Sequence, residues 1–100
     1  MRIPIQSVTD LGLAIRAVRR QSRVRIDDLA GTAGVSKQFT QDVEHGKPTV
    51  QLGRVLKLLA ELGLPLELDI PDEAVHALTT LRNGMSPRDT TVPALSKRRP

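Results

Sequence analysis

A tight turn at Gly34 is the feature that most constrains this chain, because it separates two short segments of helical character. Before the turn, Asp27 and Asp28 favour the start of a helix, since acidic side chains in a first turn interact well with the helix dipole. Gly34 ends that segment, and Ser36 is a good N-cap for a further helix that runs to about His45. The sequence therefore predicts two short helices that meet across a tight turn.

Two more amphipathic helices are predicted around this pair. Between about Asp10 and Gln21, apolar residues recur at the spacing of one helix face, and Ser7 or Thr9 offers an N-cap. Thr49 is the predicted N-cap of a last, leucine-rich helix that Gly63 ends. The predicted fold is therefore mainly helical.

Two segments alternate apolar and polar residues, which is the period of a strand. Ile3 and Ile5 flank a proline and predict a short edge strand. After Gly63 the alternation is strict, with apolar side chains at Leu64, Leu66, Leu68 and Ile70. An isolated pair of strands is marginal in water, so both strands need partners from a second chain or close packing on helices. We expect the C-terminal strand to pair with the N-terminal one or across a dimer. The four apolar residues are accordingly the predicted dimer interface.

Composition narrows the classes of function. The chain has no cysteine, which excludes disulfides and thiolate metal sites, and one aromatic residue, which argues against stacking on single-stranded nucleic acid. It has 15 basic and 11 acidic residues, a net charge of +4 that suits a polyanionic partner. Apolar runs are too short for a membrane span, and the N-terminus lacks a signal-peptide pattern, so a cytoplasmic, nucleoid-associated location is expected.

The run of residues 29–46 resembles the helix-turn-helix of the Cro and phage-repressor class. In that class the first residues of the second helix enter the major groove of DNA. Ala30 is small where the two helices cross, Gly34 allows a positive φ, and Val35 and Val43 fill the angle between the helices. The resemblance implies a lambda-repressor-like helical bundle, which here would carry the short C-terminal strand, and sequence-specific binding of DNA.

The same resemblance assigns candidate DNA contacts. Lysine can donate to guanine and glutamine can pair with adenine, so Lys37 and Gln38 are the best base readers, followed one turn later by Gln41 and Asp42. The expected phosphate contacts are the cap residue and five basic residues: Ser36, Arg16, Arg20, Arg23, Arg25 and Lys47. The alternative is that these polar side chains form an ordinary solvated surface.

Five further residues bear on the resemblance. Arg19 and Glu44 correspond to a pair that ties the first helix to the end of the recognition helix, and so orients it. Ile26 stands where the class often has a glutamine that supports the first base reader and a phosphate. Thr40 occupies a position that is normally branched and aliphatic, which predicts looser local packing. Phe39 either reaches a thymine methyl group or packs beside the core.

A narrower resemblance covers about residues 7–70. This part of the chain looks like the HipB-like antitoxins. The likeness lies in the segment from Gly34 to Thr49, the leucine-rich helix after it, Glu61-Leu-Gly-Leu64 and the alternating strand. This implies a homodimer that represses its own operon at an inverted-repeat operator and neutralises a HipA-like serine/threonine kinase toxin. In that family the C-terminal strand helps to join the two protomers.

Two other classes of function remain as alternatives. One is a phage or restriction-modification repressor without a toxin partner, and the other is a protein-interaction adaptor that no longer binds DNA. An enzyme is not expected, because His45 and His76 lack metal-binding spacing and no nucleophilic constellation, cofactor motif or metal site is evident. We expect a DNA-binding and dimerisation domain over residues 1–70 and a weakly helical or flexible tail over residues 71–100.

Overall fold

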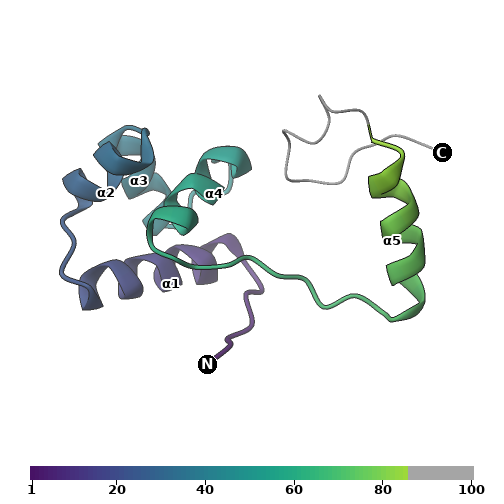
Figure 1. Cartoon of the computed structure of the whole chain (residues 1–100). Coiled ribbons are helices and arrows are strands. Elements are labelled where there is room, and N and C mark those ends of the chain that lie inside the picture. Colours follow the sequence, from purple (N-terminus) through teal and green to yellow (C-terminus); the bar gives the residue numbers. More distant parts are fainter. Residues whose placement is uncertain (86–100) are drawn as a thin grey trace. The chain divides into compact units, whose positions relative to one another are not determined.

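The computed structural model describes residues 1–85, and all regular secondary structure in that range is helical (Figure 1). The helices are α1 Val8–Gln21, α2 Ile26–Ala33, α3 Lys37–Glu44, α4 Leu52–Glu61 and α5 Glu73–Asn83. They fall into two compact units, of which the first is Met1–Leu66 and the second begins at Glu67. No helix within residues 1–85 is long and apolar enough to cross a membrane.

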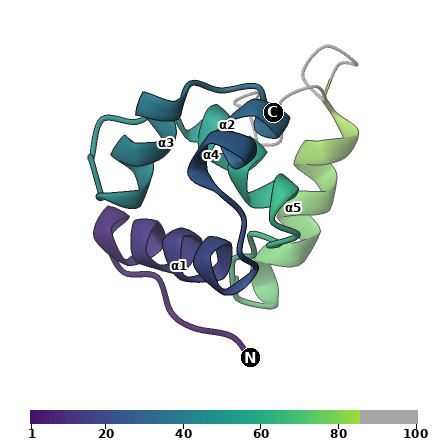
Figure 2. The same cartoon turned by 90° about the vertical axis from the view of Figure 1, so that its left-hand side faces the viewer.

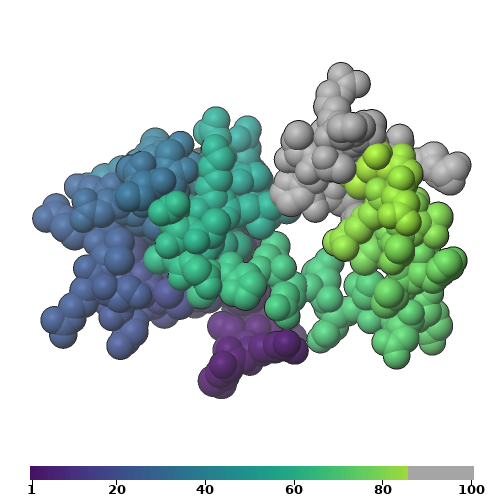
Figure 3. Space-filling model, viewed as in Figure 1, coloured from purple at the N-terminus to yellow at the C-terminus, as the bar shows by residue number. Residues whose placement is uncertain are grey.

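Helices α1 to α4 enclose one apolar core. Helix α3 packs against α1 and α2, and α2 also packs against α4. In both cartoon views α1 runs beneath the other three helices of this unit (Figures 1 and 2). In the space-filling view their side chains merge into one continuous body (Figure 3). The most deeply buried apolar residues come from all four helices: Ile15, Leu29, Val43, Val55 and Leu58.

The turn between α2 and α3 has the geometry that the sequence predicts. Gly34 has a φ of 73°, in the left-handed region where glycine carries no side-chain penalty. The N–H of Val35 donates to the carbonyl of Ala30 at 3.0 Å, which closes the end of α2. The Ser36 hydroxyl accepts from the N–H of Phe39 at 2.9 Å, and so caps α3 as expected.

Helix α1 begins as predicted at a serine cap and comes very close to the end of α3. The Ser7 hydroxyl accepts from the N–H of Asp10 at 3.0 Å, which decides between the two predicted caps. A Cβ atom built on Gly12 would lie 2.2 Å from the carbonyl oxygen of Val43. A Cβ atom built on Gly46, which has a φ of 78°, would lie 2.8 Å from Oγ1 of Thr9. The α1–α3 contact is therefore between backbones, and it depends on the missing side chain of Gly12.

The prediction of a C-terminal strand is wrong, because the described residues form no strand there. Leu64 packs against the core, but the rest of that segment is outside it, with Leu66 54% and Leu68 84% exposed and Ile70 also exposed. Alternation reports which side chains share a face, whereas a strand also requires a neighbouring backbone with which to form hydrogen bonds. Pro65 further removes one backbone donor from the segment. The first unit is thus a helical bundle without a sheet in the described range.

The N-terminal segment and two local expectations also differ from the prediction. Residues 3–5 form no strand, and Ile3 and Ile5 are exposed. Helix α4 has Gln51 as its N-cap, without a side-chain bond, instead of the predicted Thr49. Thr40, for which loose packing was predicted, is fully buried. Its hydroxyl donates to the carbonyl of Ser36 at 3.0 Å, so the polar group is satisfied and the packing stays tight.

We expect Gly12→Ala to lower the free energy of unfolding by about 2–3 kcal/mol, because the new methyl group must push the backbone of α3 away from α1. Gly31→Ala is the matched control, since a Cβ there meets nothing within 4 Å and alanine is the better helix former. Urea unfolding followed by circular dichroism measures both. A Gly12→Ala protein as stable as the wild type would contradict the close contact.

Candidate nucleic-acid interface

Helix α3 has one buried and one outward face. Thr40, Val43 and Glu44 are buried against the other helices. The residues predicted to read bases lie on the other face, where Lys37 and Gln38 are exposed and the next turn is half-buried at Gln41 and Asp42. The structure therefore brings the four predicted base readers onto one side of a single helix. Phe39 packs against the core, in agreement with the simpler of its two interpretations.

A buried ion pair holds the C-terminal end of α3. The carboxylate of Glu44 accepts from Nε of Arg19 at 2.6 Å and from Nη2 at 2.9 Å, a bidentate arrangement. The third guanidinium nitrogen, Nη1, donates to the carbonyl of Val24 at 3.0 Å. The hydrogen bond to Glu44 raises the pKa of Arg19 and outweighs the desolvation that acts to lower it. One side chain thus connects α1, the loop after it and α3.

A carboxylate on α2 contacts the first predicted base reader. Nζ of Lys37 lies 3.1 Å from Oδ1 of Asp27, and Nη2 of Arg25 lies 3.7 Å from Oδ2 of the same carboxylate. The hydrogen bond from Lys37 lowers the pKa of Asp27, and its positive charge adds to the effect. From the sequence, Asp27 was interpreted only as a helix-start signal, because its partner lies ten residues away across the turn. No local pattern would have revealed this contact.

A second carboxylate contacts the other main predicted base reader, Gln38. The amide Nε2 of Gln38 donates to Oδ1 of Asp42 at 2.9 Å, one helical turn along α3. Nζ of Lys47 lies 3.6 Å from Oδ2 of Asp42. Asp42, predicted to contact bases itself, therefore stands between a base reader and a predicted phosphate contact.

The remaining predicted phosphate contacts come from α1 and the turns. Arg20, Arg23 and Arg25 are exposed and Arg16 is half-buried on α1. Arg23 has a φ of 58°, a left-handed conformation that usually favours glycine, at the turn that ends α1. The Ser36 hydroxyl already accepts a helix-capping bond, so its own proton is left as the possible donor to a phosphate.

Comparison with known proteins gives consistent matches over this unit. The helix-turn-helix domain family matches residues 10–69. The chain is 44% identical over 69 residues to the uncharacterized HTH-type transcriptional regulator y4mF of Sinorhizobium fredii (strain NBRC 101917 / NGR234), which covers 69% of this chain and 91% of that protein.

Solved structures also match this unit of the chain. A chain of a HipB-O4 20mer complex superposes with a TM-score of 0.65 at 25% identity and covers 71% of this chain and all of that one. A chain of a HipA-HipB-O2-O3 complex is similar at the same TM-score, identity and coverage.

We expect Glu44→Ala to lower the free energy of unfolding by about 3–5 kcal/mol, because it leaves the largely buried charge of Arg19 without its partner. Glu44→Gln, which keeps an acceptor, should fall between this variant and the wild type. Lys47→Ala is the control, since it breaks an exposed pair that contributes about 1 kcal/mol or less. Thermal and urea unfolding compare the three. A loss below about 1 kcal/mol for Glu44→Ala would contradict the structural importance of the pair.

Proposed function

Because this chain belongs to the helix-turn-helix family of transcriptional regulators and is HipB-like, we propose that it is a repressor that reads operator DNA with α3. As a member of that family it is a regulator and not an enzyme. The observation that carries the proposal is the outward face of α3, where polar side chains with base-pairing chemistry gather on a helix whose other face is anchored in the core.

The chemistry of that face suits the major groove. Lys37 can donate to O6 and N7 of guanine, and the amide of Gln38 can pair with N6 and N7 of adenine. Gln41 and Asp42 follow on the same side of the helix, one turn further from its N-terminus. Contacts to phosphates then come from Ser36 and from Arg16, Arg20, Arg23, Arg25 and Lys47. The first set specifies sequence, and the second adds affinity that does not depend on it.

We expect Gln38→Ala to weaken operator binding by roughly 1–3 kcal/mol and to relax base preference at one position of each half-site. Arg20→Ala should weaken binding to all sequences alike and reduce the salt dependence by about one counterion. Both are measured by fluorescence anisotropy on a duplex selected from a random pool. Unchanged affinity and preference in Gln38→Ala would show that α3 enters the groove in another register.

A homodimer is proposed as the binding species, with an inverted repeat as its operator. A small unit that makes few base contacts gains affinity and specificity when two copies bind half-sites about 10 base pairs, or a multiple, apart. The apolar side chains of Leu66, Leu68 and Ile70 are exposed, and exposed apolar groups on neighbouring positions favour association. With Leu64, which packs on the core, they form the proposed dimer contact.

We expect the double substitution Leu66→Glu/Leu68→Glu to convert the dimer into monomers and to abolish operator binding, because it places charge in an apolar contact. Sedimentation equilibrium measures the mass of the particle in solution, and so distinguishes dimer from monomer. Leu13→Glu is the control, since Leu13 is equally exposed but lies on α1. A dimer mass for the double variant would place the interface elsewhere.

We further propose that the protein is the antitoxin of a HipBA-type system and restrains a HipA-like serine/threonine kinase. The support is the similarity to HipB chains, one of them in a HipA-HipB-O2-O3 complex. Recognition of DNA through the outward face of α3 leaves the helical surfaces on the opposite side available to a second protein. The alternatives are a repressor without such a partner, and an adaptor that has lost DNA binding.

We expect the protein encoded next to this chain to be a kinase that co-purifies with it and whose growth arrest this chain relieves. Co-expression with a tag on one partner tests the complex, and a growth assay tests neutralisation. The outward-face variant Gln38→Ala is the control, because it should keep the complex while impairing operator binding. A neighbouring kinase that ignores this chain would leave the repressor without the antitoxin role.

A further inference from the structure

Each of the two main base-reading side chains is already held by an aspartate. Lys37 is paired with Asp27 through Nζ–Oδ1 at 3.1 Å, and Gln38 donates to Oδ1 of Asp42 at 2.9 Å. The first aspartate lies in the first turn of α2 and the second on α3 itself. Both carboxylates are therefore fixed by helices, and they restrain side chains that are otherwise long and mobile.

The second oxygen of each carboxylate faces a cation that is a proposed phosphate contact. Oδ2 of Asp27 lies 3.7 Å from Nη2 of Arg25, and Oδ2 of Asp42 lies 3.6 Å from Nζ of Lys47. The same arrangement thus occurs twice, with one carboxylate between one base reader and one phosphate contact. This repetition links the two kinds of proposed DNA contact at two places on the outward face.

These contacts contribute little to the stability of the fold, so we look for their effect in the complex with DNA. The side chains of Lys37 and Asp27 are 55% and 48% exposed, and an exposed pair of this kind adds about 1 kcal/mol or less to stability. A free lysine, by contrast, loses considerable rotamer entropy when a base fixes it. A side chain that is already restrained loses less on binding and reaches fewer alternative partners. Ile26 cannot provide such support, and Asp27 beside it does.

We propose that Asp27 and Asp42 are positioning residues for sequence reading: they orient Lys37 and Gln38 toward bases and keep them from binding phosphates indiscriminately. The inference rests on the proposed DNA-binding function. It assigns to Asp42 a role exerted through Gln38 in place of direct base contact. It also implies that removing these carboxylates strengthens binding to random DNA while it weakens discrimination between sequences.

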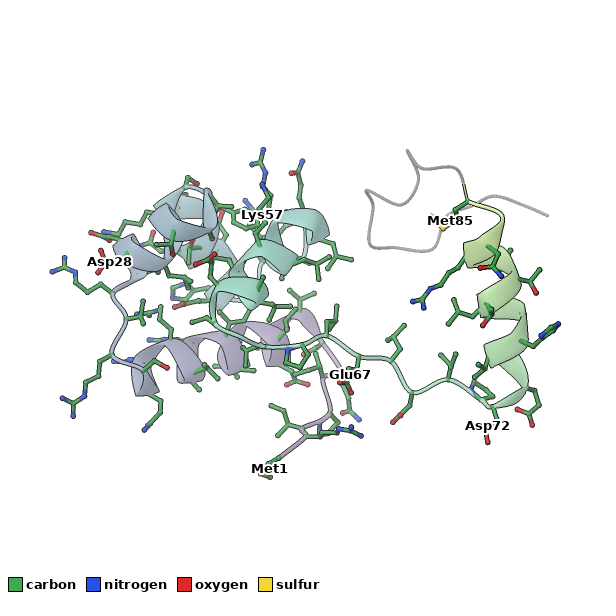
Figure 4. The ribbon with its side chains drawn as sticks, in the orientation of Figure 1. Met1, Asp28, Lys57, Glu67, Asp72 and Met85 are labelled. Carbon is green, nitrogen blue, oxygen red and sulfur yellow. The ribbon has the colours of Figure 1, made fainter. Side chains whose placement is uncertain are left out.

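The test compares Asp27→Ala and Asp42→Ala with Asp28→Ala, each of which removes one negative charge. Asp28 is the matched control because it is exposed beside Asp27 at the outer side of α2 (Figure 4), and among residues 1–85 its carboxylate makes no ion pair. Dissociation constants are measured by fluorescence anisotropy for the selected duplex, for single base-pair variants of it and for a scrambled duplex. Melting temperatures verify that each variant is folded.

All three variants should bind the scrambled duplex somewhat more tightly, because each has one more net positive charge. Only Asp27→Ala and Asp42→Ala should lose discrimination, by about tenfold, at the base pair that Lys37 or Gln38 reads. In a Lys37→Met background, Asp27→Ala should cause no further loss, because the residue acts through that lysine. This interdependence distinguishes positioning from a general effect on the fold.

Three results would overturn the inference. Equal discrimination by Asp27→Ala, Asp42→Ala and Asp28→Ala would show that the aspartates act only as charges. A loss spread over every base pair and retained in the Lys37→Met background would indicate a structural role. A wild-type protein that binds the selected and scrambled duplexes equally would overturn the proposed function itself, and this inference with it.

Discussion

The buried pair of Arg19 and Glu44 is the interaction on which the placement of α3 depends. Burying two charges is costly unless geometry is good and the remaining donors are satisfied. Here both carboxylate oxygens are engaged, and the third guanidinium nitrogen donates to the carbonyl of Val24. The pair therefore fixes the end of α3 against α1 and the loop between α1 and α2. Gly12 permits the same contact sterically, because α1 approaches α3 as backbone against backbone.

Helix α3 is anchored along one face, and its other face is turned outward. An isolated helix of eight residues is marginal in water, so α3 owes its stability to the bundle around it. Its buried residues supply that stability, and the Ser36 cap satisfies the first turn. The exposed residues are not needed for packing, so they are available for the proposed contacts with DNA. The residues that stabilise α3 and the proposed DNA contacts thus occupy opposite faces of the same short helix.

Local patterns predicted most of the helical bundle. Helical periodicity and start and stop residues located α1 to α4 to within a few residues. The cap at Ser36 was expected, Ser7 was one of two candidates for the first cap, and Gly34 adopts the positive φ that its place in the turn requires. The resemblance to phage repressors suggested that Arg19 and Glu44 would meet, and they do. These features follow from neighbouring residues or from a known motif.

The features that were not predicted from the sequence depend on contacts between residues that are separated along the chain. Alternation between residues 64 and 70 could not show whether a neighbouring backbone was available, and the strand it predicted is absent from the described residues. Asp27 was already explained by its place at the start of α2, so its contact with Lys37 had no separate signal. That contact exists only because the turn at Gly34 sets the angle between α2 and α3.

Methylation interference on the selected duplex is the direct test of DNA reading by α3, because it reports which groove the protein contacts. N7 of guanine lies in the major groove and N3 of adenine in the minor groove. We expect methylation of guanine N7 at the position read by Lys37 to block binding, at matching positions of two half-sites separated by about 10 base pairs or a multiple. Interference confined to adenine N3, or none at any guanine, would contradict reading of the major groove by α3.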